Sequence, residues 1–565
     1  MKSILHFLLC VLLLLLLVSC NRGNTDPIET DSVESADTGS EADSITESDT
    51  ESETESETDP DPSVIPTAEI AETSVYLFVG EKYNLTFTTT LSEPASGSYR
   101  QIPWSTSSDC VTVENGTVRA QKEGYAIVSG GGATQCVVRV LADNMPVLRI
   151  DTDGASISSK ETYVPCLIDL QTENSELCFE KVGAGIRLRG NSTLSRSKKP
   201  YRIKFTEKRN VLGLNEGAEC RSWVLLAERY DDSFIRNASA LTFASMILTE
   251  YSSDFCYVML ELNGEKKGVY LLAEQSQIHD ERIDIEEAGE ESGELRSGYL
   301  FEIDASSNPP SFYLEFGDRE IYNFLGDRYT ATPNDSKRTA LFYTIKNDGL
   351  TTGQTKFAEK YLNGVFQIVY SATYEGISYE FDEAFRLVPS EMTCEEAIAA
   401  VIDLDSMARK YIHSEIFCNG DEHKKSYFMY VDLSEGGSGK LVFGCPWDFD
   451  TAFVHWDSVN YRETDVHYSA TRNLWYVMIM NNAWFRERVI ETWDTLYAQT
   501  GGYSNALSLI RSILEVYGGD FQFDLNKWGR TEDYREQIPI TYDWLVARIA
   551  WLNENIARVP AKNGN

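Results

Sequence analysis

The chain has 565 residues, of which 42% are hydrophobic and 12% aromatic, and its formal net charge is -38. This length exceeds what one hydrophobic core usually serves, so two or three folded units are expected. The excess of acidic residues argues against a nucleic-acid-binding role, because phosphate backbones recruit basic surfaces.

The N-terminus has the pattern of an export signal. Lys2 precedes an apolar run over residues 4–18, and Cys20 directly follows in the stretch LVSC. The run is shorter than the ~20 residues that span a bilayer. Residues 1–19 therefore resemble a bacterial lipoprotein signal peptide, which implies lipidation of Cys20 and a membrane-anchored, extracytoplasmic protein at the bacterial cell surface. A single transmembrane anchor is the alternative.

Residues 20–64 are dominated by Ser, Thr, Glu and Asp. Between Asn24 and Ser63 there are 15 acidic residues and no Lys or Arg. A segment this polar and self-repelling cannot bury enough apolar surface to fold, so it is predicted to be a disordered tether. Binding of cations or of a basic partner is the alternative.

The cysteines do not indicate a metal site. Nine of the 11 remain once the signal and Cys20 are set aside, and none has CxxC or Cys/His spacing. Cys110 and Cys136 lie in neighbouring strand-like segments and are candidates for a disulfide. The other seven are predicted to be small apolar core residues.

Residues 65–143 alternate short apolar runs with turn residues. VYLFVG, YAIVSG and QCVVRV show period-two apolarity, and Asn115-Gly116 marks a turn. This pattern predicts a small all-β sandwich. The stretch VGEKYNLTF, together with the positions of Trp104, Ser105 and Gly124, resembles the bacterial Ig-like repeat of surface proteins, which implies a spacer or an adhesive domain.

The remaining residues, 146–560, mix strand and helix patterns. Residues 186–205 predict a strand, a polar turn and a second strand, and the turn combines basic side chains with backbone amides suited to phosphate oxygens. A basic hairpin without a ligand is the alternative, because the turn matches neither a Walker sequence nor GxGxxG. The cations of this turn are Arg189, Arg196, Lys198 and Lys199.

Two further elements follow this turn. Residues 223–246 predict a strand and then a helix capped near Asp232 or Ser233. Residues 258–275 predict a hairpin turned by Asn263-Gly264. At its end, Glu274 is a candidate partner for a lysine such as Lys204, which it would position against a nucleotide phosphate.

A third predicted helix leads to an acidic loop. Asp403 or Asp405 caps an amphipathic helix, and Asn419-Gly420 ends it and delivers Asp421 into a loop. Two strand-like runs follow, and the second ends in the sequence PWDFD. An Asp in the sequence NGD can also be a simple turn former.

The PWDFD acids complete a pattern suited to phosphoryl transfer. Asp448 and Asp450 lie 27 and 29 residues after Asp421. One carboxylate that orients a hydroxyl and two that hold a divalent metal are what transfer from a nucleotide requires. Carboxylates flanked by Trp447 and Phe449 incur a desolvation cost unless a metal or a partner compensates it.

As a set, these motifs resemble the CotH kinase family of atypical bacterial protein kinases. The resemblance is carried by RLRGNSTLSRSKKPYRIKF, DDSFIRNASA, LELNGEKKGVYLLAEQ, NGDEHKKSYFMY and PWDFDTAF. It implies a protein-kinase-like domain over residues 146–560, with ATP bound between a strand-rich and a helical lobe. It also implies that Asp421 is the catalytic residue and that Asp448, assisted by Asp450, is a magnesium ligand.

The resemblance also implies nucleotide contacts, and the sequence departs from the kinase-like pattern at one position. The implied ATP-binding residues are Arg189, Lys199, Lys204, Arg236, Glu274 and Trp447. Many kinase-like sites carry Asn as a second metal ligand five residues after the catalytic Asp, and here that position is Ser426. A hydroxyl ligates magnesium more weakly than an amide oxygen.

The expected fold is therefore multidomain: a small all-β Ig-like sandwich followed by an α+β, protein-kinase-like domain of two lobes. Residues 307–391 carry no recognisable motif and are expected to be an insertion or part of the helical lobe. The residues after Asn481 are predicted to form the helical base of that lobe.

Two functions remain open at this point. The first is an ATP-dependent kinase that requires Mg²⁺ or Mn²⁺ and phosphorylates Ser or Thr of surface or secreted proteins. The second is a non-catalytic cell-surface lipoprotein, either a pseudokinase scaffold or an adhesin that binds wall or polysaccharide. The two acidic clusters favour the first function. Export favours the second, because ATP is scarce outside a cell, and so does Ser426.

Overall fold

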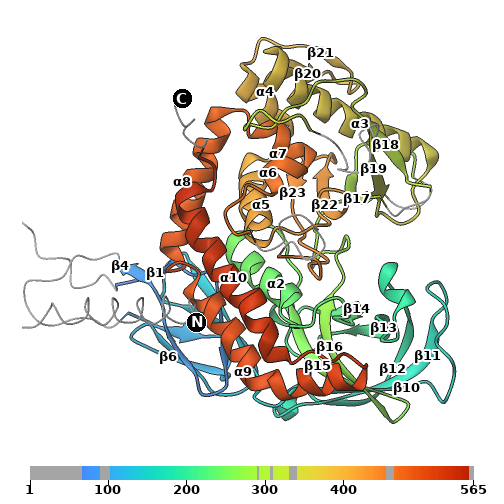
Figure 1. The fold of residues 1–565 in the computed structure, drawn as a ribbon, viewed down its shortest axis with the longest axis vertical. Helices are drawn as coiled ribbons and strands as arrows, with labels where there is room; N and C mark the ends of the chain where they lie inside the picture. The colour runs from blue at the N-terminus through green and yellow to red at the C-terminus, as the bar shows by residue number, and fades with distance from the viewer. Residues whose placement is uncertain are drawn as a thin grey trace, which may run out of the picture. The chain divides into compact units, whose positions relative to one another are not determined.

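A β-rich region comes first in the computed structural model, and a mixed α/β region follows it (Figure 1). The structure describes residues 66–89, 102–288, 292–305, 309–329, 340–453 and 463–558, all within one unit, Asp59–Asn565. The predicted signal peptide, Cys20 and the acidic tether lie outside the described residues. Among the described helices, none has the length and apolarity needed to cross a membrane.

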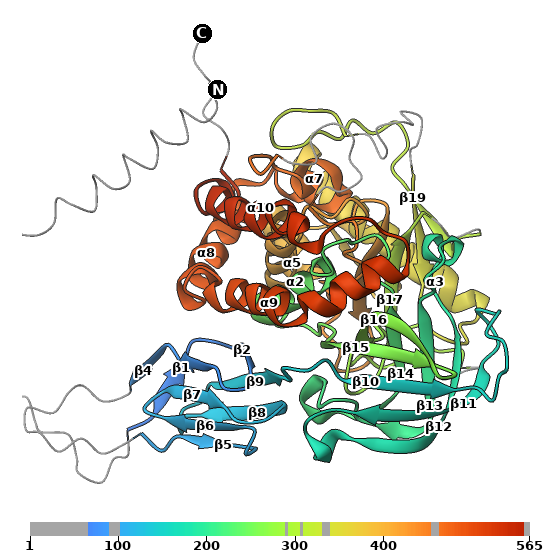
Figure 2. The same ribbon diagram turned by 60° about the horizontal axis from the view of Figure 1, so that its bottom comes forward.

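The β-rich region contains two main sheets and a two-stranded one around a single hydrophobic core (Figure 2). The four-stranded sheet has the order β2 (Ser74–Phe78), β9 (Gln135–Leu141), β8 (Gly124–Ser129) and β5 (Ser105–Thr106). The three-stranded sheet has the order β3 (Lys82–Asn84), β7 (Thr117–Ala120) and β6 (Val111–Glu114), and β1 (Ala68–Ile70) pairs with β4 (Phe87–Thr89). Alternate residues of β8 are buried, as the period-two pattern predicts.

The two candidate disulfide cysteines are not bonded to each other. Cys110 and Cys136 are both buried free thiols in the core of this sandwich. All nine cysteines of the described residues are free, and Cys178 and Cys394 are only partly buried. The disulfide prediction is therefore wrong for this structure, and both sulfurs serve as small core groups.

A closed barrel of seven strands follows the sandwich. Its order is β10 (Val147–Asp151), β11 (Val164–Gln171), β12 (Phe179–Leu188), β13 (Tyr201–Arg209), β14 (Cys220–Leu226), β16 (Glu265–Glu274) and β15 (Phe255–Leu262). Neighbouring strands are antiparallel except β10 and β15, whose parallel pairing closes the barrel. The predicted Asn263-Gly264 hairpin is confirmed, with positive φ at both residues.

A five-stranded antiparallel sheet forms the centre of the second part of the mixed region. Its order is β18 (Phe312–Glu315), β19 (Ala340–Ile345), β17 (Gly298–Asp304), β22 (Lys425–Asp432) and β23 (Val442–Phe443). The segment without a motif therefore supplies two strands of this sheet. It also supplies α3 (Thr352–Tyr370), a π-helical turn (Ser371–Glu375), and the β20–β21 hairpin (Tyr379–Phe381 and Leu387–Pro389).

Most of the remaining elements of the mixed region are helices. They are α2 (Arg236–Ile247), α4 (Cys394–Val401), α5 (Leu404–Phe417), α6 (Ser469–Arg472), α7 (Leu474–Ile479), α8 (Ala483–Gln499), α9 (Ser504–Lys527) and α10 (Tyr534–Asn555). Short 3-10 turns occur at Ser175–Leu177, Ser192–Ser195 and Asn215–Gly217. The helical C-terminal stretch is confirmed. Helix α9 contacts strand β2 of the sandwich and strand β16 of the barrel.

Specific hydrogen bonds join the sandwich to α9. The side chain of Asn505 accepts from the Tyr76 amide and donates to the Tyr76 carbonyl, both at 3.0 Å. The hydroxyl of Tyr517 donates to the carbonyl of Ala142 at 2.6 Å. The sandwich is thus attached directly to the helical part, which a loosely tethered spacer would not require.

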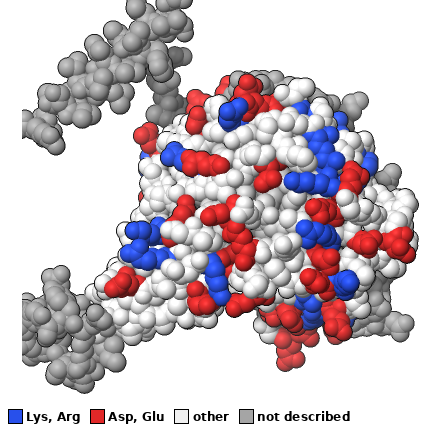
Figure 3. Space-filling view, turned by 90° about the horizontal axis from the view of Figure 1, so that it is seen from below, with Lys and Arg blue, Asp and Glu red and all other residues white. Residues whose placement is uncertain are grey.

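Surface charge is mixed on the face drawn in Figure 3. Acidic and basic side chains lie interspersed there, with neutral surface between them. On this face, the described part of the chain does not collect its negative charge into one patch. A cluster of carboxylates elsewhere therefore needs its own explanation.

Candidate functional site

A cavity of about 710 Å³ is lined by both the barrel and the five-stranded sheet. The barrel contributes the turn after β12, at residues 189–193, and the end of β14, at residues 226–230. The sheet contributes Glu302 and Phe428, and the segment after its last strand contributes Trp447, Asp448, Asp450 and Thr451. This volume is typical of a site for a small-molecule ligand.

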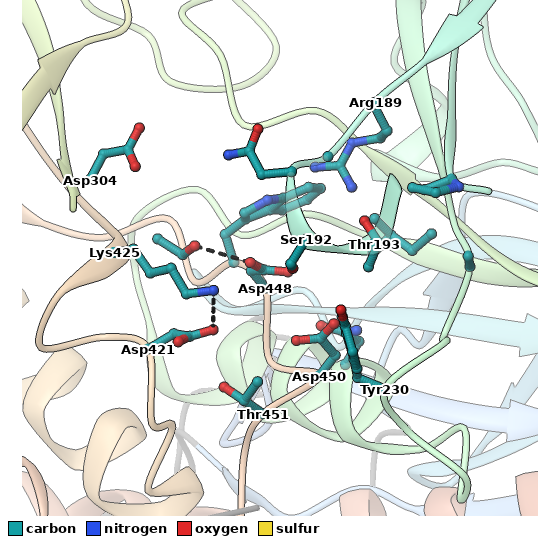
Figure 4. Close-up of a pocket in the computed structure, with 18 of the residues that line it drawn as sticks. Arg189, Ser192, Thr193, Tyr230, Asp304, Asp421, Lys425, Asp448, Asp450 and Thr451 are labelled. Atoms are coloured by element: carbon teal, nitrogen blue, oxygen red, sulfur yellow. Dashed lines mark hydrogen bonds and ion pairs between the residues drawn. The ribbon is translucent and has the colours of Figure 1, made fainter. Parts of the chain in front are cut away.

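Three carboxylates meet in this cavity. Oxygen atoms of Asp421, Asp448 and Asp450 all lie within 4.8 Å of one another. Figure 4 shows them grouped together, with Lys425 beside Asp421. Lys425 Nζ lies 2.9 Å from Asp421 Oδ2, and the hydroxyl of Ser426 donates to Asp448 Oδ2 at 3.0 Å. The structure thus brings the predicted catalytic and metal-binding residues into one place.

The local sequence explains how Asp421 reaches the cavity. Asp403 caps α5 by accepting a hydrogen bond from the Ser406 amide at 2.9 Å. Of the two predicted caps, Asp403 and Asp405, the first is confirmed. The helix ends at Phe417 because Cys418 takes a left-handed conformation with φ of 44°. The helix therefore ends before Asn419, whose side chain is free to hold the second acidic loop.

Asn419 links the two acidic loops. Its Nδ2 donates to the Asp448 carbonyl at 3.1 Å, and its Oδ1 accepts from the Thr451 hydroxyl at 2.8 Å. Because one amide holds both ends of a short segment, the loop of Asp448 and Asp450 keeps a fixed place beside Asp421. The convergence expected from the motifs depends on this bridge.

Two of the three carboxylates, Asp421 and Asp450, have raised pKa values. Burial raises the pKa of Asp421, and Asp448 adds to this effect while Lys425 opposes it. Burial, then Asp448 and Asp421, raise the pKa of Asp450 well above its usual range. Burial alone would lower the pKa of Lys425, but the three acids outweigh it and raise that pKa. A further positive charge would relieve this repulsion.

Three residues of the site have strained backbone conformations. Glu228, Ser426 and Asp448 have φ of 47°, 56° and 64°, in the left-handed region that side chains other than Gly rarely adopt. Each such residue costs on the order of 1–3 kcal/mol, and such residues are frequent at functional sites. All three line the cavity.

Two of the implied nucleotide contacts line the cavity. The guanidinium of Arg189 lies 5.4 Å from the ring centre of the buried Trp447. Burial lowers the pKa of Arg189, and Asp448 opposes this shift. The next residue, Gly190, has φ of 83°, and a Cβ there would lie 2.5 Å from the Thr193 hydroxyl. The turn after Arg189 therefore requires glycine.

Arg236 lies just outside the cavity lining, at the start of α2. Its Nη1 donates to the carbonyl of Asp450 at 3.1 Å. The predicted cap at Asp232 or Ser233 is wrong, because the N-cap position is Ile235, which makes no side-chain cap bond. The carboxylate of Asp231 instead accepts from the amides of Ser233 and Arg236, at 2.9 and 2.8 Å. Asp232 instead pairs with Arg530.

The structure separates three implied ATP-binding residues from the cavity. Lys204 is exposed, because Ile203 and Phe205 on either side of it face the barrel interior and alternation turns Lys204 outward. Glu274 is fully buried and pairs with Arg282 at 3.1 Å, so its predicted pairing with Lys204 is wrong. The ammonium of Lys199 donates to the Leu194 carbonyl within its own turn.

One cation of the basic turn points into the protein interior. Lys198 is fully buried and lies 2.7 Å from Asp524 of α9, which is also fully buried. Its ammonium also donates to the carbonyl of Val269. Lys198 therefore attaches the turn to α9 and does not face the cavity.

Several lining residues were missed by sequence reasoning. Glu302 of β17 and Lys346, directly after β19, form an ion pair of 2.7 Å at the cavity wall. Glu228 follows the end of β14 and is 2% exposed. Each of these three residues lies in a strand or just after one. For Glu228 and Lys346, the only sequence signal of a site is a polar residue that follows a buried strand.

Glu228 has the most altered environment among these residues. Burial and the neighbouring Asp231 raise its pKa to about 8. Its two carboxyl oxygens lie 3.1 and 3.3 Å from Nδ2 of Asn237, which donates to them. At neutral pH the Glu228 carboxyl is therefore mostly protonated.

We expect Glu228→Gln to remove a pH dependence of stability. Between the usual glutamate value of 4.5 and about 8, the folded protein binds a proton that the unfolded chain has released. The free energy of unfolding of the wild type therefore falls as pH rises through this window, by on the order of 5 kcal/mol from this group. Urea unfolding of both proteins from pH 5 to pH 8.5 measures the difference. Parallel pH profiles would contradict the expectation.

A comparison with known families agrees with the motifs. A family model described as CotH kinase protein matches residues 186–552, which is more than half of the chain. No curated protein matches the chain. The matched range includes the basic turn after β12, both acidic loops and all three clustered carboxylates. The chain belongs to the CotH kinase protein family.

Proposed function

We propose that the protein transfers phosphate from ATP to Ser or Thr residues of surface or secreted proteins and requires Mg²⁺ or Mn²⁺. The observation that carries this proposal is the group of three carboxylates, Asp421, Asp448 and Asp450, within 4.8 Å of one another in a cavity. In this reading the barrel and the sheet with its helices are the two lobes of a kinase-like domain over residues 146–560.

The donor set suits a hard divalent cation. The carboxylates and the hydroxyl of Ser426 offer only oxygen, which Mg²⁺ and Mn²⁺ prefer. Asp448, Asp450 and Ser426 would hold the ion. When bound, it would supply positive charge for the phosphate oxygens of the nucleotide.

The remaining roles follow from position. Asp421 orients the acceptor hydroxyl and takes up its proton, and the neighbouring Lys425, 2.9 Å away, holds the carboxylate in place. Arg189 and the amides of the turn at 190–193 contact phosphate oxygens. Trp447 and Phe428 offer apolar surface for the nucleotide base.

The same proposal includes the N-terminal parts. Residues 65–143 would be a bacterial Ig-like domain, which the two sheets around one core support. Residues 1–19 would be a lipoprotein signal peptide with lipid on Cys20, and residues 20–64 a tether to the membrane. ATP and a protein acceptor would be the partners, with no nucleic acid. These assignments rest on the sequence patterns of the N-terminus.

A phosphate-transfer assay tests the catalytic proposal. The purified chain is incubated with radiolabelled ATP, Mg²⁺ or Mn²⁺, and acceptors of two kinds, casein-like and basic Ser-rich. Transfer that is lost in Asp448→Ala and on chelation supports the proposal. The matched control is Asp405→Asn, a carboxylate exposed on α5 that pairs with Arg488 outside the cavity, and it should leave transfer unchanged.

A non-catalytic scaffold is the second candidate. It is favoured by Ser426, which stands where kinase-like sites carry Asn, and by the ion pair that Asp421 makes with Lys425. In the same assay, ATP binding that depends on the metal, without transfer to any acceptor, would support the scaffold. Transfer by the wild type excludes it.

We expect Ser426→Asn to bind Mn²⁺ about 3- to 10-fold more tightly, because an amide oxygen is a better ligand than a hydroxyl. The backbone should tolerate the change, since Asn adopts a φ of 56° more readily than Ser does. Titration calorimetry with Mn²⁺ alone measures the affinity, and Ser426→Ala is the matched control that should bind less tightly. Equal affinity of the wild type and Ser426→Asn would argue against Ser426 as a ligand.

A further inference from the structure

The segment from Asp448 to Asp450 carries two of the three clustered carboxylates, and side chains from other elements hold its backbone. Asn419 donates to the carbonyl of Asp448, and Arg236 donates to the carbonyl of Asp450, both at 3.1 Å. The amide of Phe449, between the two acids, donates to Oδ1 of Asn237 at 2.7 Å. The directions of both carboxylates therefore depend on these three contacts.

Asn237 is fixed in turn by Glu228. Because a backbone N–H can only donate, Oδ1 of Asn237 must face Phe449 and Nδ2 must face the carboxyl of Glu228. The two Nδ2 distances, 3.1 and 3.3 Å, place both carboxyl oxygens of Glu228 within reach. A chain of contacts thus leads from the end of β14, through the first turn of α2, to the acidic segment.

The residues of this chain are almost entirely buried, although Glu228 and Asn237 border the cavity. Glu228, Asn237 and Phe449 are 2%, 5% and 0% exposed. A buried backbone N–H that loses its partner costs on the order of 1–3 kcal/mol, so the Phe449 amide would move to find another acceptor. Asp448, with φ of 64°, is already in a strained conformation that its surroundings must maintain. Loss of Asn237 would therefore release the acidic segment.

We propose that Asn237, anchored by Glu228, is a positioning residue that holds the carboxylates of Asp448 and Asp450 in place for cation binding. The inference rests on the proposed function. It adds a positioning contact that leads from the end of β14, through α2, to the acidic segment. Neither residue needs to touch the cation. Partners that orient metal ligands change metal affinity by roughly 10- to 100-fold when they are removed.

Titration calorimetry with Mn²⁺ alone, at pH 7, tests the inference. Asn237→Ala should weaken Mn²⁺ binding by about 10-fold or more, and Glu228→Ala should weaken it in the same direction. Glu228→Gln should retain most of the wild-type affinity, because its side-chain oxygen still accepts from Asn237. If Glu228→Gln retains the Mn²⁺ affinity and Glu228→Ala loses it, the hydrogen bond between residue 228 and Asn237 is the cause.

Asn505→Ala is the matched control for general destabilisation. Asn505 is 6% exposed and, like Asn237, bridges a donor and an acceptor, here the amide and carbonyl of Tyr76. It lies outside the cavity lining. It should lower the melting temperature while leaving Mn²⁺ affinity unchanged. Equal weakening of Mn²⁺ binding in Asn505→Ala and Asn237→Ala would overturn the inference.

Two results separate this inference from the proposed function. A wild type that binds Mn²⁺ and transfers phosphate, beside an Asn237→Ala variant of unchanged Mn²⁺ affinity, would overturn the positioning role and leave the proposed function standing. A wild type that binds no Mn²⁺ would overturn both. In the transfer assay, the variant should show a raised metal requirement with a smaller change in the rate at saturating Mn²⁺, which supports positioning over catalysis.

Discussion

Asp421→Asn should lower the rate of phosphate transfer by about 10³-fold, because the amide can no longer accept the proton of the acceptor hydroxyl. The substitution keeps the shape of the side chain, which is 6% exposed at the cavity wall. It also removes one of three mutually repelling carboxylates, so the folded state should not become less stable. The loss should therefore appear in kcat, with little change in the KM for ATP.

Mn²⁺ binding by the same variant should stay within a few-fold of the wild type. Asp448 and Asp450 remain, and the bond from Ser426 to Asp448 is untouched. The pair of results, transfer lost and metal binding kept, distinguishes a catalytic Asp421 from a metal ligand. A variant that retains more than a tenth of the wild-type rate would refute the assignment, and Asp405→Asn serves as the surface control on α5.

The clustering of the three acids could be predicted because it follows from local patterns. Asp421 comes directly after a helix whose cap, Asp403, is visible in the sequence, and Asp448 follows a short strand of the same sheet. Loops that flank neighbouring strands meet at one edge, so their spacing was informative. In the sequence, Asn419 indicates only the end of a helix, although its side chain joins the two loops.

The facing of individual lysines could not be predicted. Lys198, Lys199 and Lys204 all belong to one basic stretch, yet the first is buried, the second is bonded within its turn and the third is exposed. Lys198 and Lys199 precede β13, so no strand period sets the direction of their side chains, and only Lys204 lies in the alternating pattern that turns a side chain outward. Arg282 lies in the loop after β16, and no local pattern marks its pairing with Glu274.

Contacts between elements that are far apart along the chain could not be predicted from the sequence either. The barrel closes through a parallel pairing of β10 with β15, and no local motif marks such a pairing. Glu228 and Asn237 lie within residues 223–246, for which the sequence predicts only a strand and a capped helix. Their importance comes from Phe449, which lies far along the chain and reaches them only in the folded structure.

The buried ion pair between Lys198 and Asp524 should give the largest effect on stability. Both side chains are fully buried, 2.7 Å apart. Burial lowers the pKa of Lys198 and raises that of Asp524, and each residue opposes the shift of the other. Lys198→Met leaves an unpaired carboxyl in the interior and should lower the free energy of unfolding by about 3–5 kcal/mol. Urea unfolding at pH 7 measures it.

A second substitution separates lost charge pairing from lost packing. The double variant Lys198→Met with Asp524→Asn buries no unpaired charge, and its amide oxygen can still accept from the Val269 amide, now 2.8 Å from Asp524. It should be more stable than Lys198→Met alone. Lys527→Met is the control on α9, where a partly exposed pair with Glu265 should contribute less than about 1 kcal/mol.

The consequence for the site follows from where Lys198 stands. It attaches to α9 the same turn that places Arg189 over Trp447 in the cavity. Lys198→Met should therefore also weaken ATP binding, measured at a temperature where the variant is folded, and the double variant should recover part of that loss. A Lys198→Met variant as stable as the wild type would show that the buried pair does not hold the turn.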